Sequence, residues 1–209
     1  ARQYGSLADN MKLDSLAAEC KLGFDVNEPH FTLPLARILS LKFHPSEPWL
    51  FAAAKRSGTD GMACPVHMIG TASGQIILTF DVVANSPDHE PVIEEMLLTA
   101  NGATLVVGTR ADGLHVFDLL DGSALPRHRI DVGGSRAFHL AHDGSRSLLA
   151  VTMDTSRQAE IRAIVLTSGS ETNYRHLGQE VASAVFATDI ARYLICTENE
   201  ILFLNSQTL

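Results

Sequence analysis

The clearest structural signal in the chain is Thr104-Leu105-Val106-Val107-Gly108-Thr109, which Asp112-Gly113 joins to Leu114-His115-Val116-Phe117-Asp118-Leu119. Both runs are rich in β-branched and apolar residues, and each has the length of one strand. An Asp-Gly pair between two such runs is typical of a tight antiparallel hairpin. The segment therefore predicts two neighbouring strands of an antiparallel sheet.

Two more runs extend this hairpin into a four-stranded unit. The apolar run 92–98 precedes it across the turn pair Asn101-Gly102, and the run 127–132 follows it across Asp121-Gly122. Four short strands within about 45 residues are the repeating unit, or blade, of a β-propeller.

The same unit recurs on both sides of this segment. Further runs with strand character are 38–43, 49–54, 65–69 and 75–80 upstream, and 136–140, 147–152, 161–166, 174–177, 181–186, 192–197 and 200–204 downstream. We therefore predict an all-β chain whose residues 35–209 form a partial β-propeller. Its blades are expected at approximately 35–84, 91–133, 135–178 and 180–209, and the fourth lacks its outermost strand.

The repeat length can be read from matched positions in the second strand of each blade. With Phe51, Leu105, Leu148 and Tyr193 matched, the spacings are 54, 43 and 45 residues. Propeller repeats of the WD40 type are about 40–45 residues long. The longer first step is explained by expanded loops, mainly at 58–64 and 84–90.

On these residues the chain resembles the WD40-like β-propeller family. Blades of that family carry an Asp-Gly turn followed by a strand that ends in Trp-Asp, and here Phe117 and Asp118 follow Asp112-Gly113. No Gly-His pair opens any blade, so the resemblance is to a divergent propeller. It rests on the regular spacing of the strands more than on sequence motifs. It implies four-stranded antiparallel blades that present loops to protein partners.

Residues 1–34 do not fit the repeat and are predicted to form an N-terminal arm. A weak helical period over 9–22 ends at Gly23, and Phe31-Thr32-Leu33-Pro34 is a candidate latch strand for the last blade. Rings of the WD40-like family usually have seven or eight blades. We therefore expect the chain to be a piece of something longer, completed by further sequence or by a partner in preference to a closed four-bladed ring.

Composition restricts the function classes. The 209 residues hold 24 acidic and 16 basic side chains, for a net charge of -8, which disfavours a nucleic-acid backbone or an anionic membrane as the main partner. No apolar run approaches the roughly 18 residues of a membrane-spanning helix. Cys20, Cys64 and Cys196 are too few for a disulfide framework, so we expect an intracellular protein of the cytoplasm or the nucleus.

Motifs for catalysis, cofactors and metals are not found in the sequence. It has no phosphate-binding loop, no dinucleotide fingerprint and no nucleophile elbow. His139 and His142 are three residues apart but fall on a strand and its turn, without a third ligand. His67 and His115 occupy matched third-strand positions and are expected to pack on blade faces. The prediction is a protein that is not an enzyme and has no catalytic, cofactor-binding or metal-binding residues.

Two regions are candidates for partner contact. The loop from 58 to 65 is more apolar than a solvated loop, which points to Gly58, Met62 and Cys64. Basic residues at the rim of one blade add Arg127 and Arg129. The alternatives are a loop folded over the rim of its own propeller and ordinary scattered surface charge.

The sequence thus predicts a non-enzymatic scaffold that binds other protein subunits within a larger complex. One alternative is a structural subunit of a ribonucleoprotein with peripheral RNA contact. Another is a propeller hydrolase, which would need Asp, Glu and His around a central metal. No such cluster stands at matched inner-strand starts, so the hydrolase is disfavoured.

Overall fold

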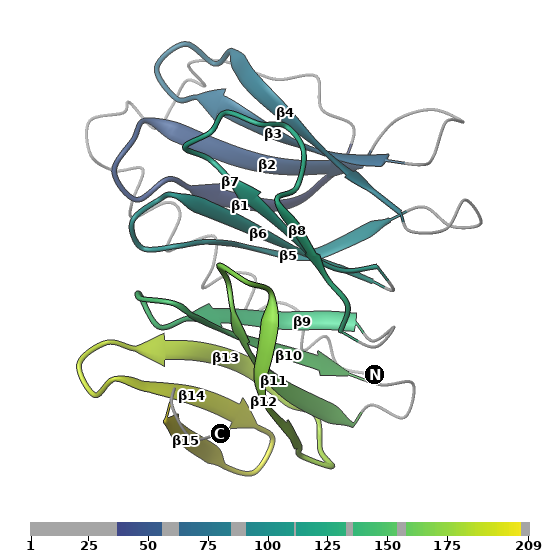
Figure 1. Ribbon diagram of the computed structural model, residues 1–209, viewed down its shortest axis with the longest axis vertical. Coiled ribbons are helices and arrows are strands. Elements are labelled where there is room, and N and C mark those ends of the chain that lie inside the picture. Colours follow the sequence, from purple (N-terminus) through teal and green to yellow (C-terminus); the bar gives the residue numbers. More distant parts are fainter. Residues whose placement is uncertain are drawn as a thin grey trace, which may run out of the picture. The chain divides into compact units, whose positions relative to one another are not determined.

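A computed structural model describes residues 37–55, 63–84, 91–110, 112–132, 136–153 and 158–205 (Figure 1). These segments belong to one compact unit, Pro34–Leu209. Their regular secondary structure is entirely β-strand, and they hold no helix long and apolar enough to span a membrane. The N-terminal arm, its helix at 9–22 and its latch strand at 31–34 lie outside the described residues.

Fifteen strands in the described residues form four blades, each with its strands paired antiparallel in chain order. Blade 1 contains β1 (Arg37–Phe43), β2 (Trp49–Lys55), β3 (Ala63–Gly70) and β4 (Ile76–Val83). Blade 2 contains β5 (Val92–Leu98), β6 (Thr104–Arg110), β7 (Gly113–Asp118) and β8 (His128–Ile130). Blade 3 contains β9 (Arg136–His142), β10 (Ser147–Met153), β11 (Ala159–Val165) and β12 (Ser170–His176). Blade 4 contains β13 (Val181–Ala187), β14 (Arg192–Thr197) and β15 (Ile201–Asn205).

Every run predicted to be a strand overlaps one observed strand, and the predicted all-β fold class is confirmed. The largest difference is at β12, which begins at Ser170 although the prediction began at Tyr174. This outermost strand of blade 3 is polar and largely exposed. It therefore lacks the apolar alternation from which strands are recognised. A single backbone pairing, Arg110 with Arg136, links blades 2 and 3 into one eight-stranded sheet.

The predicted register of blade 1 is wrong by one residue. The backbone hydrogen bond that closes the first hairpin of a blade is accepted by Trp49 in blade 1 and by Thr104 in blade 2. The next residues, Leu50 and Leu105, are therefore equivalent, so the first repeat spacing is 55 residues. Because side chains alternate across a sheet, that step places Phe51 on the opposite face of its blade from Leu50.

The hydrophobic core lies between neighbouring blades, in three clusters. Between blades 1 and 2 it includes Phe51, Val66, Phe80, Met96, Leu105 and Phe117. Between blades 2 and 3 it includes Val106, Leu114, Val116, Leu140, Leu148 and Ile164. Between blades 3 and 4 it includes Leu149, Val151, Ile161, Tyr193, Ile195 and Leu204. Blades 2 and 3 each therefore bury residues on both faces.

A hydrogen bond from His44 links the first hairpin of blade 1 to the first turn of blade 2. The Nδ1 atom of His44 accepts hydrogen bonds from the amides of Ser46 and Glu47, so Nε2 carries the proton and donates to the Gly102 carbonyl at 3.0 Å. Gly102 has φ of 69°, and a Cβ there would lie 2.1 Å from His44 Nε2. Both the backbone conformation and the close approach require glycine at this turn.

Candidate partner-binding surface

Of the residues predicted in the apolar loop, Gly58 and Met62 lie outside the described residues, and Cys64 lies in β3. The Cys64 side chain is 1% exposed and belongs to the core between blades 1 and 2. Its Sγ donates a hydrogen bond to the Ala54 carbonyl at 3.2 Å. The prediction that the loop extends to residue 65 is wrong, because the strand begins at residue 63. Cys64 therefore presents no surface to a partner in this structure.

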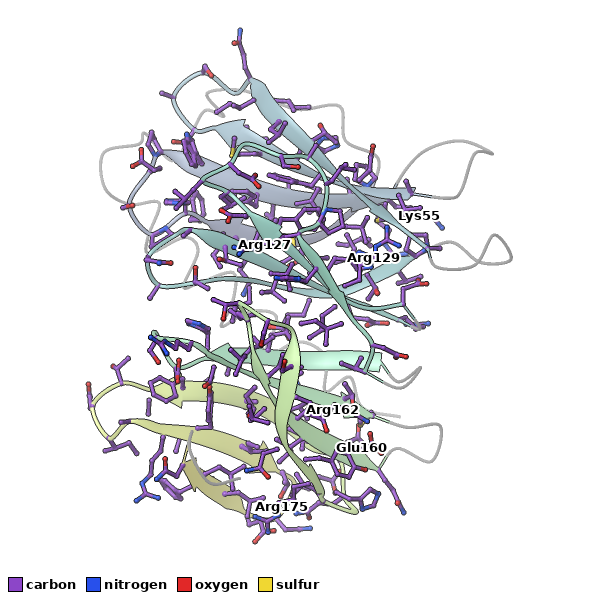
Figure 2. The ribbon with its side chains drawn as sticks, viewed as in Figure 1. Lys55, Arg127, Arg129, Glu160, Arg162 and Arg175 are labelled. Atoms are coloured by element: carbon purple, nitrogen blue, oxygen red, sulfur yellow. The ribbon has the colours of Figure 1, made fainter. Side chains whose placement is uncertain are left out.

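Arg127 and Arg129 are both exposed, but the structure gives them different surroundings (Figure 2). The Arg127 guanidinium donates to an Asp118 carboxylate oxygen at 3.1 Å. Arg129, in β8, acts electrostatically on the buried His115. The two arginines therefore do not form one basic site.

The loop between β7 and β8 has a defined shape because its own side chains bond its backbone. An Asp118 oxygen accepts from the Leu120 amide at 3.0 Å, Asp121 accepts from the Ser123 amide at 2.7 Å, and Ser123 Oγ accepts from the Leu125 amide at 3.2 Å. Such side-chain turns hold a loop in one conformation. The result is that Leu120 and Leu125 stay exposed, at 83% and 73%.

A small pocket of about 40 Å³ adjoins this loop. It is lined by Thr104, Val116, Asp118, Arg127, Leu166 and Thr167. The last two residues belong to the turn after β11, and a hydrogen bond of 2.9 Å between His128 Nε2 and the Thr167 carbonyl holds that turn against β8. The volume suits a water molecule or the tip of a small side chain. The pocket therefore offers a small recess of mixed polarity where the two ends of this loop, Asp118 and Arg127, meet.

The histidines that the sequence placed on third strands lie within their blades, as predicted. His67 is half-buried, with Nδ1 2.9 Å from Thr79 Oγ1, and burial lowers its pKa. His115 is fully buried, and neither ring nitrogen has a hydrogen-bond partner among the described residues. Burial, reinforced by the positive charge of Arg129, lowers the His115 pKa to about 4, so the ring is neutral at neutral pH.

The histidine pair of blade 3 is engaged in two separate interactions. His139 Nδ1 lies 3.7 Å from a Glu95 carboxylate oxygen, whereas His142 Nδ1 accepts from the Gly144 amide at 3.0 Å. Within the segments that the structure describes, no three metal-binding side chains gather. The described residues thus contain an ordered loop with exposed leucines, and no cluster suited to metal-assisted chemistry.

Comparison with solved structures identifies proteins of similar fold. No protein-family model matches the chain, and no curated protein matches it. The β-propeller domain of Cps50 (Swd1) from Myceliophteria thermophila is similar, with a TM-score of 0.65 and 16% identity. The match covers 87% of this chain and 62% of that one. U3-55K is similar with a TM-score of 0.60 and 15% identity over 84% of this chain and 53% of that one.

The comparisons confirm the predicted resemblance at the level of the fold, which is that of a partial WD40-like β-propeller. At these identities they show the fold alone. The chain spans less than two thirds of the length of either structure.

Proposed function

We propose that this chain is a non-enzymatic propeller segment that scaffolds other protein subunits in a larger complex, and that the β7–β8 loop is one of its partner contacts. The observation that carries the proposal is the exposure of Leu120 and Leu125 on a loop whose shape is fixed by hydrogen bonds. Gly58, Met62 and Arg129 remain proposed contacts of the same kind.

The energetics favour a protein partner for this loop. Fully burying a leucine side chain contributes about 1.5–3 kcal/mol. A loop that is already ordered loses little conformational entropy on binding, so more of that free energy appears as affinity. Interfaces of this kind depend on a few anchors in desolvated pockets. The partner expected here carries an apolar recess for the two leucines and a small polar group for the recess at Asp118 and Arg127.

The RNA and hydrolase alternatives receive less support from the described residues. Arg127 is compensated by Asp118, and Arg162 in β11 donates to both Glu160 and Glu171 (Figure 2). Arginines paired in this way are poor phosphate ligands, because a phosphate must displace a carboxylate. His115, whose pKa burial lowers to about 4, is fully buried and therefore closed off from any substrate. We therefore prefer the scaffold to both alternatives.

The proposal includes an intracellular location, in the cytoplasm or the nucleus, and a division into an arm at 1–34 and a propeller segment at 35–209.

The test is a comparison of the proteins recovered with the tagged protein from its native cells. The double variant Leu120→Ser/Leu125→Ser removes both anchors, and Ile190→Ser removes an exposed aliphatic side chain from a turn of blade 4. We expect a defined set of proteins whose recovery falls at least about tenfold in the double variant and is unchanged in the control. Equal recovery with all three proteins would show that the loop is not a partner contact.

A further inference from the structure

We propose that the outer face of blade 4 is a docking surface for another propeller blade, one that residues 1–209 do not contain. The outer face of blade 4 consists of Val185, Leu194, Cys196, Ile201 and Phe203. It is a different surface from the β7–β8 loop, and the proposal does not depend on that loop.

Side-chain alternation in blade 4 defines this face. In β14, Tyr193 and Ile195 are buried against blade 3, so Leu194 between them points to the opposite side. In β15, Leu202 and Leu204 pack in the same core, so Phe203 also points away from blade 3. The face that points away from blade 3 is therefore apolar in consecutive strands.

Strand pairing brings these side chains into one row. Leu194 is paired with Val185 of β13 on one side and with Phe203 of β15 on the other. Cys196 is paired with Ile201 in the neighbouring row. Val185 is 51% exposed, Ile201 57% and Phe203 56%. Leu194, between them in β14, is half-buried. Apolar side chains of this size that reach solvent together on one face mark an interaction surface.

Blades 2 and 3 have an equivalent row of paired side chains on the same face, and there the row packs against the next blade. The equivalent paired residues are Leu97, Val106 and Val116 in blade 2 and Ala141, Leu149 and Ala163 in blade 3. Leu97, Val106 and Val116 lie in the core that blade 2 shares with blade 3. Ala141 and Leu149 lie in the core that blade 3 shares with blade 4. In each case the row packs against the next blade along the chain, which identifies the occupant expected on the row of blade 4.

A second copy of this chain does not fit this surface. Each interface joins the outer face of one blade to the inner face of the next, so the two sides differ and the contact is not self-complementary. The remaining face of that kind belongs to blade 1, where Ala52, Ala54 and Ile69 are already buried. The occupant is therefore a blade from outside these residues.

The chemistry of that occupant follows from the three interfaces. The residues that receive the row are large and apolar, such as Met96 and Leu105 in blade 2, Leu148 in blade 3, and Tyr193 and Ile195 in blade 4. The propellers to which this chain is similar also extend well beyond the part it matches. We expect an antiparallel blade whose first and second strands offer aliphatic and aromatic side chains.

A site-specific photocrosslink tests the proposal in the cells that naturally produce the protein. Phe203 is replaced by p-benzoylphenylalanine, and the crosslinked peptide is sequenced by mass spectrometry. We expect a peptide from outside residues 1–209, with alternating apolar residues, in a segment that repeats every 40–45 residues or so. A crosslink to a second copy, to residues 1–209 of the same chain or to a helical peptide would overturn the proposal, as would no crosslink.

Charge variants show whether the crosslink reports docking. With the crosslinker at position 203, Val185→Asp or Ile201→Asp should lower the yield at least about tenfold, because each buries a carboxylate in the interface. Ile190→Asp is the matched control, also exposed and in blade 4 but on a turn, and should leave the yield unchanged. Equal yields in all variants would contradict docking at this face. Leu120→Ser/Leu125→Ser should not change the yield, so failure of this proposal and failure of the loop contact are distinguishable.

Discussion

The outer faces of blades 3 and 4 carry the same kind of side chains in the same register, but only one face is buried. In blade 3, Leu149 is fully buried against blade 4. In blade 4, the equivalent Leu194 is half-buried, and its neighbours Val185 and Phe203 are more than half exposed. The alternation of apolar residues therefore determines which face of a blade is apolar. Whether that face is buried depends on whether another blade packs against it.

The largest expected difference between the two faces is in the cost of removing their central leucines. Leu149→Ala should lower the free energy of unfolding by about 2–5 kcal/mol, because it leaves a cavity between two sheets. Leu194→Ala should cost less than about 1 kcal/mol, because water already reaches the site. Urea unfolding of the purified protein measures both, and an unchanged m-value confirms that the unfolding reaction is the same. Equal losses would show that the two faces are buried alike in solution.

The contrast between buried and exposed positions can also be tested through the pH dependence of the free energy of unfolding, using the buried His115. His115 has a pKa of about 4 in the folded protein and an ordinary value of 6.5, so unfolding takes up a proton between those pH values. Its contribution to stability is complete above pH 6.5 and falls by roughly 3 kcal/mol as the pH drops to 4. Unfolding free energies measured across this range should show that slope.

Two variants test this prediction: one removes the buried histidine, and the other places a histidine on the exposed outer face of blade 4. His115→Leu should remove most of the slope, leaving the smaller contributions of His67 and His142, whose pKa values burial also lowers. Phe203→His should add no comparable slope, because a histidine on the outer face of blade 4 stays solvated. A slope that persists in His115→Leu would contradict the burial of a neutral ring.

A smaller effect is expected from the hydrogen bond that joins blades 3 and 4. The buried Tyr193 hydroxyl donates to the Ser147 carbonyl at 2.8 Å. Tyr193→Phe should destabilise the protein by about 0.5–1.5 kcal/mol, because the Ser147 carbonyl keeps its second hydrogen bond, from the Asp143 amide. The control is Tyr174→Phe, whose exposed hydroxyl donates to Glu160 at 2.8 Å and should matter less. If both substitutions cost the same, the contact between blades 3 and 4 contributes nothing beyond a surface hydrogen bond.

The smallest change in stability is expected on the outer face of blade 4 itself. Phe203→Ser should alter the unfolding free energy of the purified protein by no more than about 0.5 kcal/mol. The same substitution should reduce the binding of a hydrophobic fluorescent dye, since it removes the largest exposed ring of the face. A large destabilisation would indicate that Phe203 is packed within the isolated chain.

The strands were predictable because each one is a local pattern of alternating residues between turn formers. The hairpin of β6 and β7 is an example, with Asp112-Gly113 at its turn and Gly113 at φ of 78°. The candidate site was less predictable. Leu120 and Leu125 flank a turn that the sequence identified, but their exposure depends on bonds from Asp118, Asp121 and Ser123, which no periodicity shows. Cys64 was misplaced because its strand begins earlier than its apolar alternation suggested.

Local sequence thus established the all-β repeat, its turns and the approximate length of each blade. Three features came from packing alone: the register that puts Phe51 toward blade 2, the burial of His115, and the uncovered row on blade 4. The physical reason is the distance along the chain over which each effect acts. Strand and turn preferences act over neighbouring residues. Burial instead depends on a second sheet that packs about 10 Å away and belongs to a different repeat of the chain.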